Sequence, residues 1–597
     1  MTDETGPALF GVRRSLGGKT WRLTQADEAE ITAISRAHQI NDALARLLAS
    51  RGFDAQSAGQ FLEPKLRDSF PDPSSFTDMD RAAELVWDAI ESGTKIALFT
   101  DYDVDGATSA AQLYRWLNAV SEPPIIYVPD RIEEGYGPNT EAFKSLQARG
   151  VEFVITLDCG AAATEPLTAA QALGLSVAVI DHHLMSGERP PAQALINPNQ
   201  PGDQSACGHL AAAGVAFVFL AALNREGRRR GRLTKDTEPD ILSFLDLAAL
   251  GTICDVVPLT GVNRAIVSQG LKLMSGWQQT GLAALAEVSG IEGPASAYHA
   301  GFLLGPRINA GGRIGRANLG AELLTQDDPV IAARLAGELD GLNAERREIE
   351  SKVVEAAIEQ VEAQLIDDNT PILMAVGHDW HVGVIGIAAG RLKDRFNRPS
   401  LVISVDSQTG IAKGSGRSCP GVDLGQAVAA AREAGLLSAG GGHAMACGLT
   451  ADATRLDELR AFLTERLSQT WIEADEARAV MVDAVVHPSA VDFEFVSALS
   501  AAEPFGMGNR QPRFGFSDLR RTFSKRVGKN HVRFTFQSRS GANLTGIAFG
   551  IADQPIGQAL LKPGEASFHV VGTLKAQDNA YGRRAELHLE DLAEIEA

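Results

Sequence analysis

At 597 residues the chain is long enough for about three or four domains, and its composition, 45% apolar and 22% charged, is that of an ordinary folded protein. A formal net charge of −20 argues against nucleic-acid binding by the surface as a whole, so such binding would need a local basic cluster. We expect no signal peptide, and the five scattered cysteines, which form no CxxC motif, favour reduced thiols in a cytoplasm over disulfides or a structural zinc.

Helical and strand patterns follow one another along the first half of the chain. Residues 20–92 are polar with a helical pattern and end in the turn-rich Phe70-Pro-Asp-Pro-Ser-Ser. From residue 95, short apolar runs alternate with helical segments, which is the pattern of a parallel sheet. We expect strands over 95–100, 125–128, 152–156 and 176–180, and apolar helices over 208–223 and 240–255.

Three carboxylates stand at alternate positions after the first expected strand, in Asp101-Tyr-Asp103-Val-Asp105-Gly106. Open α/β sheets bind ligands where a strand ends and a helix begins. Like charges so close raise one another's pKa unless a cation neutralises them, and a divalent metal ion is the simplest such cation. An EF-hand loop would need Glu in place of Gln112 and a helix before it, so we do not favour one. A solvated acidic turn is the other alternative for this motif alone.

Further acidic and imidazole side chains stand where other elements of this sheet end. Asp158 follows one expected strand, Asp181-His182-His183 follow another, and Asp255 ends an apolar helix. A single Asp in such a place is ordinarily a cap or a turn former, but several in one sheet favour a shared site. Carboxylates and imidazoles without thiolates suit Mn²⁺ or Mg²⁺ better than zinc. Two ions about 3.5–4 Å apart, bridged by one carboxylate, would form a two-metal hydrolytic site.

The second half of the chain contains three further patterns. Residues 328–366 form a long charged helical pattern suited to bridging domains. A second α/β unit starts near Pro371 and runs to about residue 466, with a glycine-rich segment over 439–448. After it, short strands joined by turns suggest a small β-barrel.

Basic residues cluster twice in spite of the acidic total. Residues 510–539 hold nine Lys and Arg against the single acid Asp518, and residues 225–232 hold five Arg. Either cluster suits phosphate binding, and for either a solvated loop is the alternative. In the first cluster, phenylalanines that could stack on bases are interleaved with the cations: Phe514, Phe516, Phe534 and Phe536.

Taken in order, these acidic motifs resemble the four motifs of the DHH phosphoesterase superfamily: Asp101-Tyr-Asp-Val-Asp-Gly, Leu157-Asp-Cys-Gly, Asp181-His-His and Gly251-Thr-Ile-Cys-Asp. The segment Gly441-Gly-His443-Ala-Met-Ala-Cys-Gly448 resembles the signature of the partner DHHA1 domain. Within the superfamily, roughly residues 75–597 are most similar to the bacterial single-strand-specific exonucleases. The supporting segments are Asp130-Arg-Ile-Glu-Glu-Gly, Gly305-Pro-Arg-Ile-Asn, Trp380-His-Val-Gly-Val and Glu503-Pro-Phe-Gly-Met-Gly-Asn.

The resemblance implies an α/β fold, in which a parallel-sheet DHH domain is joined by a long helix to an α/β DHHA1 domain and followed by an OB-like β-barrel. The boundaries that we expect are 1–75 for an N-terminal helical region, 76–327 for the DHH domain, 328–366 for the linking helix, 367–466 for the DHHA1 domain and 467–597 for an OB-fold nucleic-acid-binding domain.

The resemblance also implies the metal ligands. Two Mn²⁺ or Mg²⁺ ions would be held by Asp103, Asp105, Asp158, His182 and Asp255, with Asp158 as the bridge. Asp101 and Asp181 would be ligands or would orient ligands. His183 would be a catalytic electrostatic group that faces the scissile phosphate.

Substrate contacts are implied as well. Gly441, Gly442 and His443 would contact phosphate, although a plain turn with a core His is the alternative. Ser415 and Arg417 would suit a terminal 5′-phosphate, and Arg307 is a third phosphate candidate. Tyr136 and Trp380 could stack on bases, with core packing as their alternative.

These implications together describe an enzyme that digests single-stranded DNA from 5′ to 3′ into nucleoside 5′-monophosphates, in recombination and repair. The expected partners are single-stranded DNA, a single-strand-binding protein and a RecQ-type helicase, in a bacterial cytoplasm. Two alternatives stay open. One is a DHH-type oligoribonuclease or nucleotide phosphatase, and the other is a non-catalytic DNA-binding protein.

Overall fold

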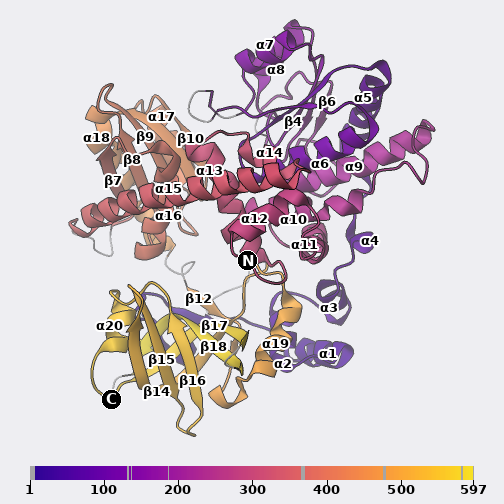
Figure 1. Cartoon of the computed structure of the whole chain (residues 1–597). Coiled ribbons are helices and arrows are strands. Elements are labelled where there is room, and N and C mark those ends of the chain that lie inside the picture. Colours follow the sequence, from indigo (N-terminus) through magenta and orange to yellow (C-terminus); the bar gives the residue numbers. More distant parts are fainter. Residues whose placement is uncertain are drawn as a thin grey trace. The chain divides into compact units, whose positions relative to one another are not determined.

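The structure is a computed structural model that describes residues 7–130, 134–135, 137–185, 187–364, 370–474, 479–579 and 582–595 (Figure 1). The chain divides into two compact units. Unit I comprises residues 63–347 and 504–510, and unit II comprises 1–62, 348–503 and 511–597. Among the described residues, no helix is both long enough and apolar enough to cross a membrane.

Unit I is built on a five-stranded sheet of order β3-β2-β4-β5-β6, in which all neighbouring strands are parallel. From β2 the chain goes to β3 at one edge and then returns to the other side of β2 as β4. The topological switch point, where such sheets bind ligands, therefore lies between β2 and β4. The four strands expected from the sequence are confirmed and β6 is additional: β2 (Ile96–Thr100), β3 (Ile125–Tyr127), β4 (Phe153–Leu157), β5 (Ser176–Ile180) and β6 (Ala194–Ile196).

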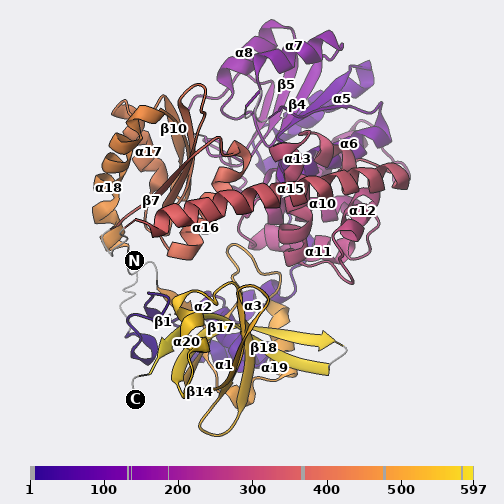
Figure 2. The ribbon, with the colours of Figure 1, turned by 60° about the vertical axis from the view of Figure 1, so that its left-hand side comes forward.

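Helices cover both faces of this sheet, and Figure 2 shows α7 and α8 beside β4 and β5. Side chains of one strand alternate between the two faces, and because both faces are covered the central strands β2 and β4 are mainly apolar and buried along their whole length. One face packs on α7 (Thr140–Ala148) and α8 (Thr164–Ala172). The other face packs on α5 (Met79–Ser92), α6 (Val104–Val120) and α9 (Ala212–Arg229).

The rest of unit I is helical, and α10 is its centre. This helix packs against α6, α9 and α11. With α9 it confirms the two apolar helices expected from the sequence, with shifted ends. The helices are α4 (Leu66–Ser69), α10 (Leu245–Cys254), α11 (Gly261–Met274), α12 (Thr280–Val288), a π-helical turn (His299–Leu304), α13 (Gly305–Ile314) and α14 (Leu319–Leu324).

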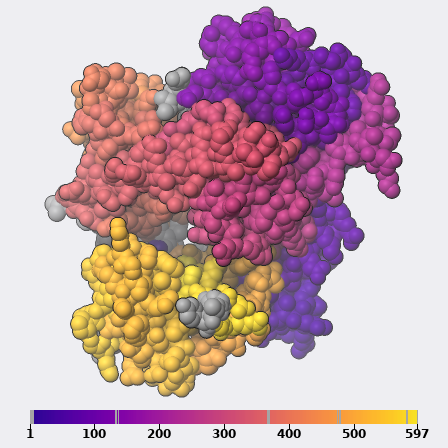
Figure 3. Space-filling view, viewed as in Figure 1, coloured from indigo at the N-terminus to yellow at the C-terminus, as the bar shows by residue number. Residues whose placement is uncertain are grey.

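The long helix expected over 328–366 is present as α15 (Pro329–Glu362). Its first part, including Leu335 and Leu339, is buried in the core of unit I. Its last part, including Val353 and Val361, is buried in a core cluster of unit II. The helix thus contributes to both units, and its remaining side is exposed; Figure 3 shows this part of the chain on the surface.

Unit II contains a second five-stranded sheet of order β10-β11-β9-β8-β7. Strands β7 and β8 are parallel, and the remaining neighbours are antiparallel. The elements are β7 (Leu373–His378), α16 (Val382–Phe396), β8 (Ser400–Val405), β9 (Ile411–Arg417), α17 (Leu424–Glu433), β10 (Ala439–His443), β11 (Ala446–Asp452) and α18 (Leu456–Glu473).

The C-terminal strands of unit II form a barrel. They pair in the order β14-β15-β16-β18-β17, and β17 pairs back with β14, so the five strands close as in an OB-fold. The barrel expected from the sequence is confirmed. Its elements are β14 (Arg513–Val527), β15 (His531–Gln537), β16 (Asn543–Ala548), α20 (Pro555–Leu561), β17 (Ser567–Asn579) and β18 (Gly582–Glu594), preceded by β13 (Ala484–Val485) and α19 (Phe493–Ala498).

The N-terminal segment belongs to unit II and is not purely helical. Besides α1 (Glu28–His38), α2 (Asp42–Ser50) and α3 (Ala55–Leu62), it contains the strand β1 (Trp21–Leu23), which pairs in parallel with β12 (Val480–Val482). The buried carboxylate of Asp591 in β18 accepts hydrogen bonds from Ser15 Oγ (2.6 Å), Gly17 N (3.1 Å) and Trp21 Nε1 (2.8 Å). The segment therefore packs on the barrel region, which the helical prediction did not anticipate.

Candidate metal centre

The first three carboxylates lie in the turn between β2 and α6. Asp103 caps α6, because its Oδ1 accepts a hydrogen bond from Gly106 N at 3.1 Å. A Cβ at Gly106 would lie 2.5 Å from the carbonyl oxygen of Asp101, so only glycine fits this close approach. The turn leaves Asp101 and Asp105 buried and Asp103 half-buried.

Asp105 is held by the first turn of α9. Its Oδ2 accepts a hydrogen bond from Ala212 N at 2.7 Å, and its Oδ1 accepts one from Ala213 N at 2.8 Å. Backbone N–H groups at a helix N-terminus have no partner within the helix, and the helix dipole favours an anion there. The orientation of this buried carboxylate is therefore fixed.

Asp158 directly follows β4 and has φ at +60°, in the left-handed region that non-glycine residues rarely adopt. Its N–H donates to the carbonyl of Ile180 at 2.9 Å, at the C-terminal ends of β4 and β5. Strained residues of this kind gather at functional sites. The conformation places Asp158 Oδ1 3.4 Å from His182 Nε2 and 3.9 Å from His183 Nδ1.

Asp181, at the end of β5, orients His183. Its Oδ1 accepts hydrogen bonds from His183 Nδ1 at 2.7 Å and from the backbone N–H of His182 at 2.7 Å. Its Oδ2 accepts one from Ala161 N at 2.9 Å. Burial raises the pKa of Asp181, but the hydrogen bond from His183 and the others outweigh burial and leave it below its usual value. Both oxygens of Asp181 are thus used to hold neighbouring groups.

His182 directs one ring nitrogen at the carboxylates. Its Nδ1 lies 3.0 Å from the carbonyl oxygen of Leu210, which requires the proton on Nδ1 and leaves a lone pair on Nε2. Nε2 lies 3.4 Å from Asp158, 3.6 Å from Asp255 and 3.8 Å from Asp105, and it is buried without a hydrogen-bond partner. A lone pair that faces three carboxylates is stabilised by a cation between them.

Asp255 follows the last residue of α10 and completes this group. The next residue, Val256, is a second non-glycine residue in the left-handed region, with φ at +60°. Among the described residues, three overlapping sets of ligand atoms result, and the atoms of each set lie within 4.8 Å of one another. They are Asp105, His182 and Asp255; Asp158, His182 and His183; and Asp101, Asp103 and Asp158.

The electrostatics of the cluster point to the same need for a cation. Burial, reinforced by the neighbouring carboxylates, raises the pKa of Asp105 and of Asp158 well above the usual value. Burial and the charge of Asp103 raise the pKa of Asp255 to about 7. Burial lowers the pKa of His182 and so favours a neutral ligand. For His183 the hydrogen bond to Asp181 outweighs burial and raises the pKa.

The donor set fits hard divalent cations. Carboxylates and imidazoles are the ligands that Mn²⁺ and Mg²⁺ accept, and no thiolate takes part. Cys159 and Cys254 lie beside candidate ligands, but burial is the main cause that raises their thiol pKa values, so they stay protonated and inert. All five cysteines of the chain are free.

A second group of predicted site residues lies together on the sheet of unit II. Arg417, Ala446 and His443 are direct neighbours across β9, β11 and β10, and Ser415 faces Gly448 and then Gly441 in the next row. Cross-strand neighbours share a face of the sheet. A Cβ at Gly441 or Gly448 would meet no atom within 4 Å, so bare backbone is accessible beside Ser415 and Arg417. His443 is exposed, so the alternative of a core histidine is wrong.

The remaining predicted site residues lie elsewhere. Arg307 is only 7% exposed; its Nε donates to Asp340 at 2.9 Å and its Nη1 to the carbonyl of Leu303 at 2.8 Å. Trp380 is half-buried, packed against a core cluster of unit II. Gly442 has φ at +154° and faces the β11 backbone. Tyr136 lies outside the described residues.

The arginine-rich run 225–232 is neither a free cationic patch nor a solvated loop. Its first part lies in α9, and each of the five arginines pairs with at least one carboxylate. Arg230, for example, lies 2.7 Å from Asp88 of α5 and 2.6 Å from Glu226. The run therefore ties α9 to α5, and its cations are already neutralised.

The basic stretch 510–539 is also largely paired within the barrel region. Arg513 lies 2.6 Å from Glu590, and Arg521 donates to backbone carbonyls that include Ala559 at 2.9 Å. The four phenylalanines are buried in the barrel core, so the expectation that they stack on bases is wrong: Phe514, Phe516, Phe534 and Phe536. Phe523 is 48% exposed and shares a face of β14 with exposed Lys525, two residues on.

Sequence reasoning missed an exposed aromatic pair in unit I. Tyr298 and Phe302 are 61% and 65% exposed, and their rings stack with centroids 5.3 Å apart. Tyr298 directly precedes a π-helical turn and Phe302 lies within it. The carbonyl oxygen of Ala300 in this turn lies 3.5 Å from Sγ of Cys254, one residue before Asp255. π-Helical turns are frequent at functional sites. Their spacing of four residues was visible in the sequence, but their exposure was not.

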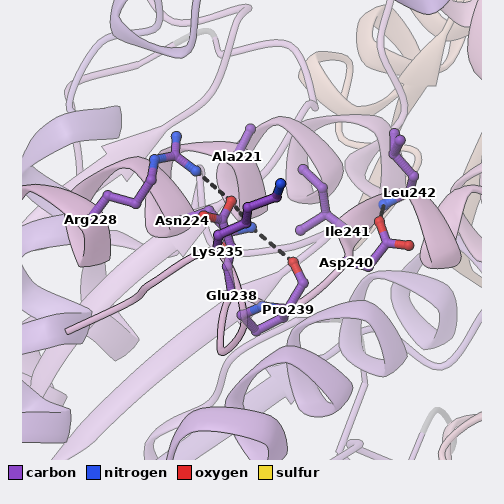
Figure 4. A pocket seen from close by; sticks show the side chains of 9 residues that line it. All are labelled: Ala221, Asn224, Arg228, Lys235, Glu238, Pro239, Asp240, Ile241 and Leu242. Atoms are coloured by element: carbon purple, nitrogen blue, oxygen red, sulfur yellow. Dashed lines mark hydrogen bonds and ion pairs between the residues drawn. The ribbon is translucent and has the colours of Figure 1, made fainter. Parts of the chain in front are cut away.

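A pocket of about 430 Å³ lies apart from the metal centre, near the end of α9. Figure 4 shows Arg228 paired with Glu238, and Asn224 bound to the carbonyl of Pro239 at 2.9 Å. None of the predicted site residues lines this pocket. It contributes nothing to the candidate metal centre.

Three family models match the chain. They are the DHH family, N-terminal domain, over residues 95–252; the DHHA1 domain over residues 369–469; and the RecJ OB domain over residues 482–591. The first contains all predicted metal ligands except Asp255, and the second contains Ser415, Arg417 and His443. The resemblance inferred from the motifs is confirmed.

Relatives match the whole domain order. The chain is 36% identical over 577 residues to single-stranded-DNA-specific exonuclease RecJ of Bacillus subtilis (strain 168), a match that covers 96% of this chain and 70% of that protein. RecJ of Thermus thermophilus in complex with Mn²⁺ matches with a TM-score of 0.79 and 28% identity, over 97% of this chain and 80% of that chain. The structure of the same Thermus thermophilus protein in complex with Mg²⁺ matches with a TM-score of 0.73 and 27% identity, over 97% of this chain and 79% of that chain. The identity and coverage of these relatives, together with the three domains, show that the chain belongs to the RecJ family.

Proposed function

We propose that the protein is a metal-dependent exonuclease that hydrolyses single-stranded DNA from the 5′ end into nucleoside 5′-monophosphates. The observation that carries the proposal is the group of three overlapping ligand sets around Asp158 and His182. Relatives named single-stranded-DNA-specific exonuclease, and a matching structure that contains Mn²⁺, support the same activity and the same kind of ion.

Two ions would occupy this group, with Asp158 common to both. One would be held by Asp105, His182 and Asp255, joined by Asp158, whose Oδ1 lies 3.4 Å from His182 Nε2. The other would be held by Asp101, Asp103 and the same Asp158. Ions so placed supply electrostatic stabilisation of the phosphate and activate water without a covalent intermediate. Asp181 is assigned as an orienting residue and not a ligand because, unlike Asp105, it belongs to none of the three ligand sets found among the described residues. Its oxygens accept hydrogen bonds from His183, His182 and Ala161.

His183 would act on the phosphate directly. Its raised pKa favours the imidazolium form, and the ring is held by Asp181 through Nδ1. The second N–H, on Nε2, would then donate to a non-bridging oxygen as negative charge develops. The histidine side chain is 45% exposed, in keeping with a group that substrate reaches.

The sheet of unit II would bind the terminal 5′-phosphate. Ser415 Oγ and the Arg417 guanidinium lie on one face of β9, and bare backbone at Gly441 and Gly448 leaves room for an anion. Arginine binds phosphate in a directional, charge-assisted manner. Fixing the 5′ end in this way would set the polarity of digestion. Arg307 would contribute only if phosphate replaced Asp340 as its partner.

Bases would stack on exposed aromatic rings. Tyr298 and Phe302 in unit I and Phe523 on the barrel are accessible, whereas the four core phenylalanines are not. Stacking tolerates any base sequence, as an exonuclease requires.

The domain boundaries, partners and location are part of the proposal. We keep the boundaries 76–327, 328–366, 367–466 and 467–597; the matched regions begin and end within them or within a few residues. The free cysteines suit a reducing cytoplasm. A single-strand-binding protein and a RecQ-type helicase would supply suitable strands during recombination and repair.

The test is digestion of one single strand labelled at either end, in Mn²⁺ or Mg²⁺, with RNA and duplex DNA as controls. A 5′ label should appear at once as mononucleotide, while a 3′ label should remain in progressively shorter strands. Early release of the 3′ label would reverse the polarity, and preference for short RNA would favour the oligoribonuclease alternative.

A further inference from the structure

The segment Glu503-Pro-Phe-Gly-Met-Gly-Asn has no role in the function proposed above, yet part of it belongs to unit I. Residues 504–510 cluster with 63–347, far from them in sequence. They form a closed turn, in which Gly506 and Asn509 exchange backbone hydrogen bonds of 2.9 and 3.1 Å. The Asn509 side chain braces the turn, because its Nδ2 donates to the carbonyl of Pro504 at 2.7 Å.

This turn is docked on the loop that follows Asp255. Leu259 N donates to the carbonyl of Met507 at 2.8 Å. A Cβ at Gly508 would lie 3.1 Å from Pro258 Cβ, and a Cβ at Gly506 would lie 2.7 Å from Leu259 Cδ1. Gly508 also has φ at +70°. Gly508 is therefore the position where the fit against Pro258–Thr260 favours glycine most strongly, whereas a methyl at Gly506 would displace only the end of the Leu259 side chain.

The same loop is also bound by Asn263 of α11. Its Nδ2 donates to the carbonyl of Pro258 at 3.0 Å and to the carbonyl of His209 at 2.7 Å. His209 precedes Leu210, whose carbonyl orients His182. The loop at Pro258 and Leu259, three and four residues after Asp255, is thus held by both Asn263 and the turn Gly506–Asn509; we call these contacts the clamp.

Between the clamp and Asp255 lies a strained residue. Val256 has φ at +60°, a conformation that β-branched residues avoid, and its side chain is 61% exposed, so its own packing does not hold it there. Such a conformation persists only when the surrounding structure imposes it. Without the clamp, Val256 would relax toward negative φ and turn Asp255 away from His182 Nε2, which now lies 3.6 Å from it.

We propose that the turn Gly506–Asn509 is a positioning element for the metal ligand Asp255, acting through the loop 256–260 and the strained backbone of Val256. The inference rests on the proposed metal-dependent function. The proposal gives a role to a segment that begins at residue 504, more than 240 residues after the ligand Asp255 in the sequence.

The experiment measures Mn²⁺ binding to the full-length protein without DNA, from the loss of the free-ion electron paramagnetic resonance signal. Gly508→Ala should weaken binding of one ion by about tenfold or more, as is typical when a group that orients a ligand is lost. Gly506→Ala, whose new methyl meets only the end of the Leu259 side chain, should weaken it less. Gly541→Ala is the matched control, because Gly541 has φ at +89° but no atom within 4 Å of a Cβ.

A double variant separates positioning from general damage. Glycine adopts positive φ without steric strain, so in Val256→Gly the backbone at residue 256 no longer favours a change to negative φ. The effect of Gly508→Ala on Mn²⁺ affinity should therefore be clearly smaller in the Val256→Gly background than in the wild type. If Gly508→Ala reduces expression, Gly506→Ala alone carries the same comparison.

The outcomes are distinct. Mn²⁺ affinity unchanged in both glycine variants overturns the positioning role while leaving the proposed function intact. If Gly508→Ala lowers Mn²⁺ affinity equally in the wild type and in Val256→Gly, the turn does not act through the strained backbone of Val256. Absence of Mn²⁺ binding by the wild type overturns the proposed function itself.

Discussion

Asp158 is the residue on which the proposed chemistry depends most, because it belongs to two of the three ligand sets and has a strained backbone. Asp158→Ala should reduce turnover by at least about a thousandfold, since loss of a shared ligand removes several kcal/mol of transition-state stabilisation. Affinity for single strands, measured in EDTA, should change little. Near-wild-type turnover in saturating Mn²⁺ would contradict the shared-ligand assignment.

The metal centre should also control how stability depends on pH. In the absence of metal, burial and Asp103 raise the pKa of Asp255 to about 7, above the value of about 3.9 in an unfolded chain. A carboxyl with a raised folded pKa stabilises the fold fully below about pH 4, and this contribution is lost as the pH rises toward 7. Bound Mn²⁺ replaces the lost protons.

The melting temperature of the chelated protein should therefore fall between pH 5 and 8 more than that of Asp255→Asn. The increase in melting temperature that Mn²⁺ produces should be larger at pH 8 than at pH 5.5. Calorimetry with and without Mn²⁺ at the two pH values checks this. Equal increases at both values would mean that the ion does not compete with protons at these carboxyls.

Residue spacing predicted that the acidic side chains would lie together, because Asp101, Asp158 and Asp181 each follow a strand and parallel strands bring their C-terminal ends to one edge. It could not distinguish ligands from orienting residues. Asp158 and Asp181 each follow a strand directly, and what separates them is that Asp158 belongs to two of the ligand sets found among the described residues and Asp181 to none. Spacing also failed for Phe534 and Phe536, since a separation of two puts both on one face without saying that this face is the barrel interior.

At the scale of single elements, β9 offers the clearest prediction. Arg417→Ala should weaken the use of 5′-phosphorylated strands more than that of 5′-hydroxyl strands, because one charge-assisted contact is lost only for the former. KM for the two substrates measures the difference. Lys413→Ala is the matched control, as Lys413 lies on the same strand and face but two and four residues before Ser415 and Arg417. An equal rise in KM for both substrates would assign Arg417 another role.

The positions of helices and strands along the chain were predicted more reliably than the tertiary contacts that their side chains make. The strands of unit I and helices α9, α10 and α15 lie where the apolar patterns placed them, since their faces are buried along their length. The arginines at the end of α9 show the limit. Their partners Asp80, Asp88 and Glu91 lie on α5, well over a hundred residues earlier, so the sequence shows the cations without the carboxylates that neutralise them.

At the scale of the whole molecule, removal of the C-terminal part is a poor way to separate DNA affinity from chemistry. A chain that ended near residue 470 would lose β12, the partner of β1, and Asp591, the partner of Trp21. It would also lose residues 504–510, which belong to unit I. The defect would then combine lost affinity with damage to both units, so point substitutions on the barrel surface are required.

Phe523 and Lys525 are suitable positions, because both are exposed on one face of β14 while most of the neighbouring arginines are paired. Phe523→Ala should weaken binding to a long single strand by about fivefold or more, given about 1–3 kcal/mol for each stacked base. Lys525→Ala should lessen the slope of log affinity against log salt by about 0.7, the value for one phosphate contact on a single strand.

Fluorescence anisotropy in EDTA measures both effects without digestion, and Lys235→Ala in unit I is the control for loss of an exposed cation elsewhere. Turnover of very short oligonucleotides should remain near the wild-type value, because the metal centre and the β9 site lie outside the barrel. An unchanged affinity and salt slope in both barrel variants would mean that this face does not bind DNA. The closed barrel would then be better explained as a surface for a protein partner.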